Sequence, residues 1–312
     1  MQVLQDEQDI DASIQSEINQ LLGKFNKNNI TYNKKILVLS GGGVKGLVYY
    51  GSFKALDELG ILENIHTFAV ASAGAYIVSL YLMGYTVNEM EDFLYLFDFK
   101  KLSSVNSFED ISPNKLFINM GLDEGENIHK IINKLLKGKK LKENITLLEL
   151  YQISKKKIIA STVCLNNGQT EYISYENYPN LRLSDLLRMT SAVPIFYAPV
   201  IINDKYYIDG GMSDNYPISL FNDNIEEVIG LYTITKTEYT KINNFKDYLY
   251  IIFKSFCDSL VSKSIRGYEK YTIIIDSKIE NFLQFELTNK KKEDLFNIGY
   301  KNVIDFFKSE KI

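Results

Sequence analysis

Two short apolar runs, each followed by small residues and then by a helical pattern, constrain the fold of this chain most. "KILVLS" (residues 35–40) leads through glycines into "VKGLVYYGSFKALDELG", which stops at Gly60, a typical helix C-cap. "HTFAVAS" (residues 66–72) leads into the helical pattern "AGAYIVSLYLMG". Strand, helix, strand, helix within about fifty residues predicts an α/β fold whose mostly parallel sheet is covered by helices on both faces.

The rest of the chain adds strands and helices at wider spacing. Residues 86–150 have a mostly helical pattern with loops, and the later helical pattern "LRLSDLLRMTSAVPIF" breaks at Pro194. "KIIASTVC" and "TEYIS" flank the turn "LNNGQ" and predict a strand pair at residues 157–164 and 170–174. Further strands are expected at residues 205–209, 226–233 and 271–276, and helices at residues 245–262 and 290–309.

The N-terminal segment differs from the body of the chain. Its apolar residues 10, 14, 18, 21, 22 and 25 follow helical spacing in a polar, acidic stretch, which predicts an amphipathic helix rather than a signal peptide. A polar linker, "NNITYNKK", follows. We expect an N-terminal helix and linker (1–34), a main domain (35–235) and a C-terminal extension (236–312) that packs on the same domain.

The composition argues against several classes of protein. Of 312 residues, 46% are hydrophobic and 24% charged, and the net charge of −4 favours a soluble globular protein with no nucleic-acid partner. Cys164 and Cys257 lie in apolar runs without the spacing of a disulfide framework or a metal site, so we expect buried thiols in a reducing compartment. The longest apolar stretch, residues 68–83, is too short to span a membrane. We expect a cytoplasmic protein that binds no metal.

A glycine-rich turn, "LSGGGVKG" (residues 39–46), links the first strand to the first helix and allows three interpretations. A dinucleotide-binding turn would need an acidic residue at the end of the second strand, which ends instead in alanine and serine. A P-loop would need Ser or Thr after Lys45, where Gly46 and Leu47 stand. An oxyanion hole built from backbone N–H groups fits the pattern, as does a tight turn without chemistry.

Ser72, between the second strand and the second helix, is a candidate nucleophile. A nucleophile elbow has the pattern G-x-S-x-G, and here Gly74 fits it whereas Val70 stands in the first glycine position. The serine needs a base. His66 lies roughly 20 Å away along the same strand, and His129, in a separate helical pattern, has nothing around it that supports a triad.

A carboxylate is the other candidate base. Asp209 ends a predicted strand and is followed by Gly210 and Gly211, which allow another loop to approach closely. A buried, hydrogen-bonded aspartate can act as a general base, although an aspartate that merely starts a turn is also common.

These segments occur in the order found in patatin-like phospholipases, and residues 35–220 resemble that family. The resemblance implies a three-layer α/β/α sandwich with a mostly parallel central sheet, and a Ser–Asp dyad that hydrolyses lipid acyl esters through an acyl-enzyme without a cofactor. The matching residues are the nucleophile Ser72, the base Asp209, the oxyanion-hole glycines Gly41, Gly42 and Gly43, and the supporting Lys45, Gly46, Gly74, Pro194, Gly210 and Gly211.

Val70 departs from the family pattern and defines an alternative function. If it distorts the elbow, the chain is a catalytically impaired lipid-binding or scaffolding protein rather than a lipid acyl hydrolase. Lys45 stands where the family often has arginine, which keeps the charge. A phospholipid or other lipid ester is the expected substrate, with transient contact at a membrane surface. "KLLKGKKLK" (residues 134–142) has five lysines in nine residues and could dock on anionic headgroups, or form a solvated helix end.

Overall fold

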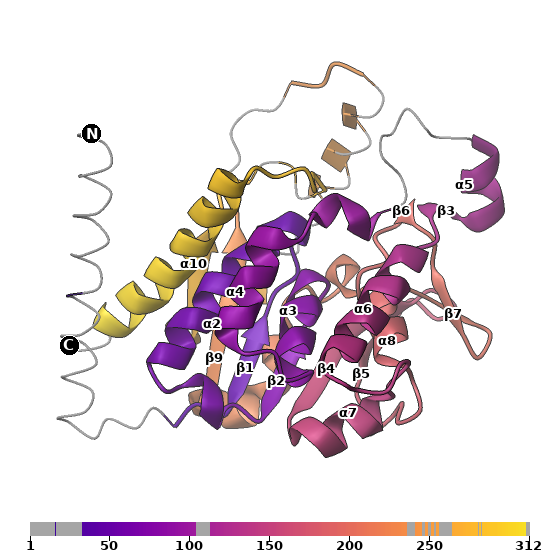
Figure 1. Cartoon of the computed structure of the whole chain (residues 1–312). Helices are drawn as coiled ribbons and strands as arrows, with labels where there is room; N and C mark the ends of the chain where they lie inside the picture. Colours follow the sequence, from indigo (N-terminus) through magenta and orange to yellow (C-terminus); the bar gives the residue numbers. More distant parts are fainter. Residues whose placement is uncertain are drawn as a thin grey trace.

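The structure is a three-layer α/β/α sandwich with a mostly parallel central sheet, as the sequence predicts (Figure 1). The computed structural model describes residues 16, 33–103, 113–235, 241–244, 247–248, 251–252, 254–255, 264–279, 281 and 283–309. Almost all of the helix expected at residues 10–25 and most of the one expected at 245–262, including Cys257, lie outside the described residues.

The central sheet has eight strands among the described residues, in the order β10–β9–β1–β2–β4–β8–β7, with β5 beside β4. The strands from β10 to β4 are parallel, whereas β4 pairs with β5 and β8, and β8 with β7, in antiparallel fashion. Their bounds are β1 Ile36–Leu39, β2 Thr67–Val70, β4 Lys157–Cys164, β5 Gln169–Ile173, β7 Val200–Ile202, β8 Lys205–Asp209, β9 Val228–Ile234 and β10 Thr272–Asp276.

Helices cover both faces of this sheet because its strands are apolar on both sides. Leu37 and Leu39 of β1 join the larger core, and Ile36 and Val38 point to the opposite face and join a smaller one. The smaller core is covered by the 3₁₀ segment η6 (Pro217–Glu227). The larger core is built with the helices α2 Val48–Glu58, α3 Ala73–Leu82, α4 Val87–Leu96, α6 Glu126–Gly138, α7 Leu147–Ser154, α8 Leu183–Thr190 and α10 Asn289–Ser309.

The C-terminal helix α10 packs directly on α2 (Figure 1). The two backbones approach so closely that a Cβ at Gly51 would lie 1.9 Å from the carbonyl oxygen of Phe296, and one at Gly299 would lie 1.8 Å from that of Val48. The Ser52 hydroxyl also donates to the Gly299 carbonyl at 3.3 Å. Glycine at both positions is therefore what permits this contact.

Several elements differ from expectation. The strand pair β4–β5 is confirmed, but β9 begins at Val228 because the two residues before it end η6. The sequence did not predict β7 or a small parallel sheet of β3 (Gly121–Asp123) and β6 (Ile195–Tyr197), since these strands are only three residues long.

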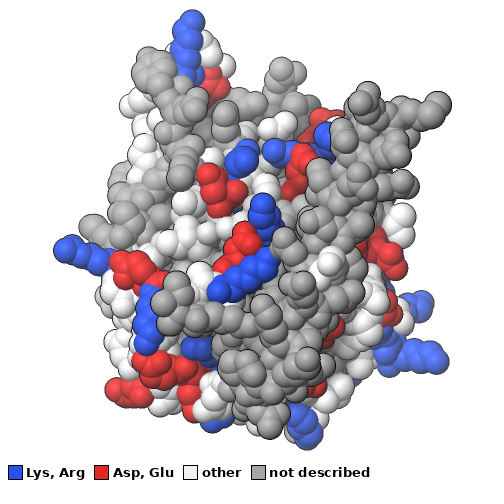
Figure 2. All heavy atoms as spheres, turned by 90° about the vertical axis from the view of Figure 1, so that its left-hand side faces the viewer, with Lys and Arg blue, Asp and Glu red and all other residues white. Residues whose placement is uncertain are grey.

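The surface and the helices add two observations. Acidic and basic side chains alternate over the face shown in Figure 2. In the part of the chain that the structure describes, each helix is too short or too polar to cross a bilayer.

Candidate active site

Ser72 occupies a sharp turn between β2 and α3. Its φ of 44° and ψ of −117° lie in a region that residues other than glycine rarely adopt, so the surrounding structure must hold it there. The Ser72 N–H donates to the Thr190 hydroxyl at 2.9 Å, and that hydroxyl donates to the Ser161 carbonyl at 2.8 Å. The turn is thereby tied to α8 and β4.

Small residues let the neighbouring elements close around this turn. A Cβ at Gly74 would lie 2.9 Å from the Cβ of Leu39, and one at Gly46 would lie 2.7 Å from the Cβ of Ala73. Val70, by contrast, is the last residue of β2, pairs with Leu39 and Ala160, and is fully buried in the larger core. Its side chain therefore packs into the core beneath the turn.

The sheet register brings Asp209 to the level of Ser72. Val70 of β2 pairs with Ala160 of β4, and two residues further along β4, Thr162 pairs with Asp209 of β8. Both candidate residues are thus neighbours of the same strand at the same height, one on each side of it.

Asp209 is almost completely buried, and it is held by hydrogen bonds. The Gly211 N–H donates to its Oδ1 at 2.7 Å, and the Asp209 N–H donates to the Ala192 carbonyl at 3.0 Å. Burial raises the pKa of Asp209 from 3.8 to about 6, while hydrogen bonds from the Gly211 N–H and the Ser72 side chain act to lower it. A carboxylate with this pKa can accept a proton near neutral pH.

The glycine-rich turn lies directly beside Ser72. A Cβ at Gly41 would be 3.0 Å from the Ser72 Cβ. The Gly41 N–H donates to the Asn215 carbonyl at 3.1 Å and so faces away from any ligand. Within the described residues, the N–H groups of Gly42 and Gly43 have no backbone acceptor, and the φ of Gly43 is 54°.

A network beneath this turn fixes its position. The Thr233 N–H donates to the Ser40 hydroxyl at 3.1 Å, and that hydroxyl is 2.8 Å from the hydroxyl of Tyr49. A Cβ at Gly42 would lie 2.7 Å from the Thr233 Oγ1. The sequence did not predict a role for these residues, because Ser40 follows a strand, Tyr49 lies in a helix and Thr233 lies in a strand, each without a distinctive pattern.

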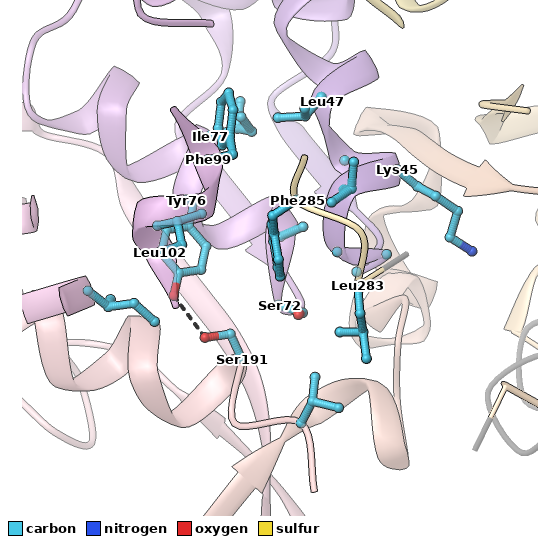
Figure 3. A pocket seen from close by; sticks show the side chains of 18 of the residues that line it. Lys45, Leu47, Ser72, Tyr76, Ile77, Phe99, Leu102, Ser191, Leu283 and Phe285 are labelled. Carbon is cyan, nitrogen blue, oxygen red and sulfur yellow. Dashed lines mark hydrogen bonds between the residues drawn. The ribbon is translucent and has the colours of Figure 1, made fainter. Parts of the chain in front are cut away.

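A largely apolar cavity opens from Ser72 and Asp209 (Figure 3). Tyr76 and Ser191 supply two hydroxyl groups 2.8 Å apart in its wall, and burial raises the pKa of Tyr76 to about 12. Most of the remaining lining is aliphatic or aromatic and includes Ile77, Leu80, Phe93, Ile132, Leu135 and Phe285. Since α3 begins directly after Ser72, its inward-facing residues up to Leu80 extend the cavity to about 12 Å from the serine.

Other predicted residues lie apart from this pair. His129 is half-buried on α6 with its Nδ1 3.9 Å from Asp185, and burial lowers its pKa. Lys45 lines the cavity, but its amine extends away from Ser72 (Figure 3). Pro194 directly follows the wall residue Val193 and does not itself line the cavity.

The supporting glycines of the aspartate turn, Gly210 and Gly211, are in close contact with their surroundings. A Cβ at Gly210 would lie 2.2 Å from the Ser161 carbonyl oxygen, and one at Gly211 would lie 2.8 Å from the Asn215 Oδ1. Asn215 therefore contacts both the aspartate turn and the glycine-rich turn. The only feature of the sequence that could have indicated this role is that Asn215 lies six residues after Asp209.

The lysine cluster of residues 134–142 is partly neutralised. Lys139 forms an ion pair with Glu89 at 2.6 Å, and Lys142 forms one with Glu149 at 2.8 Å.

Cys164, expected to be a buried thiol, is fully buried.

Comparisons with known proteins agree on the family and the fold. Residues 37–222 match the family model described as patatin-like phospholipase. An uncharacterised protein of Acanthamoeba polyphaga mimivirus is 29% identical over 280 residues, which are 86% of this chain and 92% of that protein. A protein of Invertebrate iridescent virus 6 named "Probable lipid hydrolase 463L" is 30% identical over 186 residues, which are 60% of this chain and 62% of that protein.

Two solved structures resemble this one in fold. The crystal structure of VipD from Legionella pneumophila has a TM-score of 0.60 at 19% identity, covering 89% of this chain and 67% of VipD. The type III effector protein ExoU of Pseudomonas aeruginosa has a TM-score of 0.51 at 13% identity, covering 88% of this chain and 53% of the solved ExoU chain. The present chain thus spans about half of that structure.

Proposed function

This chain belongs to the patatin-like phospholipase family, and we propose from that premise that it is a lipid acyl hydrolase with Ser72 as nucleophile and Asp209 as general base. The observation that carries the proposal is the sheet register, which puts Ser72 and a buried Asp209 at the same height on either side of β4, at the head of an apolar cavity, with the Ser72 side chain close enough to lower the pKa of Asp209. A nucleophile and a base within hydrogen-bond reach are the minimum that acyl transfer needs.

The reaction proceeds in two halves. Asp209 takes the Ser72 proton as Oγ attacks the ester carbonyl carbon, and the tetrahedral intermediate collapses when Asp209 returns that proton to the leaving alkoxide oxygen. The acyl group is then bound to Ser72. A water molecule gives a proton to Asp209 and its oxygen attacks the acyl carbon, and the proton passes to Ser72 Oγ as the fatty acid leaves. One carboxylate thus serves both halves without histidine.

The N–H groups of Gly42 and Gly43 stabilise the oxyanion in this proposal. Both lack a backbone acceptor within the described residues and lie in the turn beside Ser72. Gly41, expected to be a third donor, has its N–H bonded to Asn215 and instead provides the close approach to the serine. Donors already fixed by the Ser40–Thr233 network need no reorganisation during the reaction.

The cavity supports a substrate with a long apolar acyl chain, such as a phospholipid. Its walls are mostly aliphatic and aromatic, and the Tyr76 and Ser191 hydroxyls are polar groups near the reacting end (Figure 3). We propose that the protein meets such substrates in transient contact with a membrane.

The alternative is a catalytically impaired lipid-binding protein, and labelling by a fluorophosphonate separates the two. We expect wild type to be labelled and to release fatty acid from mixed phospholipids, whereas Ser72→Ala and Asp209→Asn do neither. Cys164→Ser, at a buried thiol outside the cavity, is the matched control and should be labelled like wild type. A folded wild type that stays unlabelled would favour the impaired protein.

A further inference from the structure

An exposed apolar surface lies at one end of the molecule, on α5 (Pro113–Asn119) and the small sheet that follows it. We call Phe117, Ile118, Met120 and Ile195 the rim patch. Phe117 is 82% exposed and Ile118 77%, which is unusual for neighbouring large apolar residues on one short helix. Figure 1 shows α5 extending from the body beside β3 and β6.

The patch is held together by the small sheet. Gly121, next to Met120, pairs with Ile195, and a Cβ at Gly121 would lie 2.2 Å from the Ala198 backbone nitrogen. Ile195 is 46% exposed and has a φ of 73°, a conformation that β-branched residues rarely adopt. The Tyr197 N–H bonds to the Val193 carbonyl at 2.8 Å across this strained residue. The fold thus holds Ile195 exposed, in a backbone conformation that is unfavourable for isoleucine.

The rim patch borders the cavity. Val193 and Tyr197, two residues either side of Ile195, both line it. Leu102 also lines it, and its carbonyl accepts from the Tyr197 hydroxyl at 3.4 Å. The apolar walls of the cavity and the exposed apolar patch therefore meet along the segment that contains Ile195.

We propose that the rim patch inserts into the surface of a phospholipid bilayer and brings the cavity mouth to it. This inference rests on the proposed function, since a lipid with its acyl chain in the cavity would otherwise have to cross water. Apolar side chains at an interface bind by burial among the acyl chains, and here that burial is continuous with the path into the cavity.

The lysine cluster of α6 is not part of this surface. The first residue of α6, Glu126, follows the small sheet, and the lysine cluster lies at the other end of the helix. The length of α6 therefore separates the cluster from the small sheet by about 15–20 Å. Two of its lysines are also paired with glutamates. Docking through the rim patch therefore predicts binding to zwitterionic phosphatidylcholine, which has no net charge, whereas docking through lysines does not.

A tryptophan reporter tests the contact directly, because the chain contains no tryptophan. Phe117→Trp is compared with Ile153→Trp, whose native residue is 56% exposed on α7, at the bottom of the molecule in Figure 1, whereas α5 lies near the top. Both carry Ser72→Ala so that phosphatidylcholine vesicles stay intact. We expect emission at position 117 to shift to the blue and to be quenched by brominated lipid, with no change at 153. Equal behaviour at the two positions would overturn the proposal.

A second pair of variants measures the contribution of the patch. Phe117→Asp/Ile118→Asp should lower partitioning onto phosphatidylcholine vesicles by at least about tenfold, and Ile153→Asp should leave it unchanged. Wild type that fails to partition, or a double variant that partitions like wild type, would refute membrane docking. So would a dimer in sedimentation velocity that the double substitution dissociates, because the patch would then bind a second copy.

Hydrolysis of a soluble short-chain ester keeps the two proposals distinct. With Ser72 intact, the double variant should hydrolyse this monomeric substrate at the wild-type rate while losing activity on vesicles. Absence of ester hydrolysis in wild type, with vesicle partitioning still dependent on Phe117, would refute the proposed function alone. Normal hydrolysis of vesicle lipid by the double variant would refute the docking surface alone.

Discussion

The buried carboxylate of Asp209 should cost the protein stability at neutral pH, and Asp209→Asn should remove that cost. The folded state raises the pKa of Asp209 from 3.8 to about 6, so it binds the proton more tightly than the unfolded state does. Each tenfold difference in proton affinity is worth about 1.4 kcal/mol, and the shift therefore corresponds to about 3 kcal/mol.

The sign of the effect follows from the direction of that pKa shift. Below about pH 4 the carboxyl is protonated in both states and its favourable contribution is complete. As the pH rises through 6 the folded protein must carry a buried negative charge, and the contribution is lost. Asparagine cannot ionise, so the stability of Asp209→Asn relative to wild type should increase by about 3 kcal/mol between pH 4 and pH 7.

Urea unfolding at a series of pH values measures this difference. The other titrating groups are shared by the two proteins and cancel, provided that the m-value is unchanged. Asp204→Asn, which removes a carboxylate from an exposed turn, is the matched control. A relative stability of Asp209→Asn that is flat between pH 4 and pH 7, or that falls with rising pH, would refute the assignment of Asp209 as a desolvated base.

Three further predictions follow from the same site. The rate of Ser72 labelling by a fluorophosphonate should rise about tenfold per pH unit below 6 and level off above it, because only ionised Asp209 accepts the proton. Gly42→Ala should lower kcat by about 10²–10³ with little change in KM, measured on a soluble ester, because its Cβ would meet Thr233 Oγ1 at 2.7 Å and displace the oxyanion donors. Val70→Gly should lower the free energy of unfolding in urea by about 2–4 kcal/mol and leave the labelling rate no higher than that of wild type.

The sequence predicts the central fold well because local pattern and tertiary environment agree there. The apolar runs that became β1, β2 and β4 are long enough to be buried on both faces, and small residues mark the turns that follow β1 and β2. The strands β3, β6 and β7 were not predicted, because a strand of three residues is too short to show an alternating hydrophobic pattern. β3 and β6 form only because each offers the other a partner from a distant segment, and β7 forms by pairing with β8, which follows it directly in the chain.

The candidate site likewise contains residues that the sequence could predict and residues that it could not. Ser72 and Asp209 follow or end predictable strands, next to glycines that indicate close backbone approach, so the sequence could predict that they lie near each other. The roles of Thr190 and Thr233 could not be predicted, because they depend on hydrogen bonds to Ser72 and Ser40, which lie more than a hundred residues away in the chain. A threonine at the end of a helix or strand has no sequence signal that distinguishes this role.

The geometry around Val70 supports the proposal that Ser72 can act as the nucleophile without a glycine two residues before it. The unusual backbone belongs to Ser72, whereas Val70 still has extended strand geometry and pairs on both sides. The tight contacts fall on the helix side of the turn, where Gly74 meets Leu39. What the elbow requires is therefore space between α3 and β1, together with a hydrogen bond that holds the strained serine. A valine whose side chain packs into the core interferes with neither, and it adds apolar burial to the strand that carries the turn.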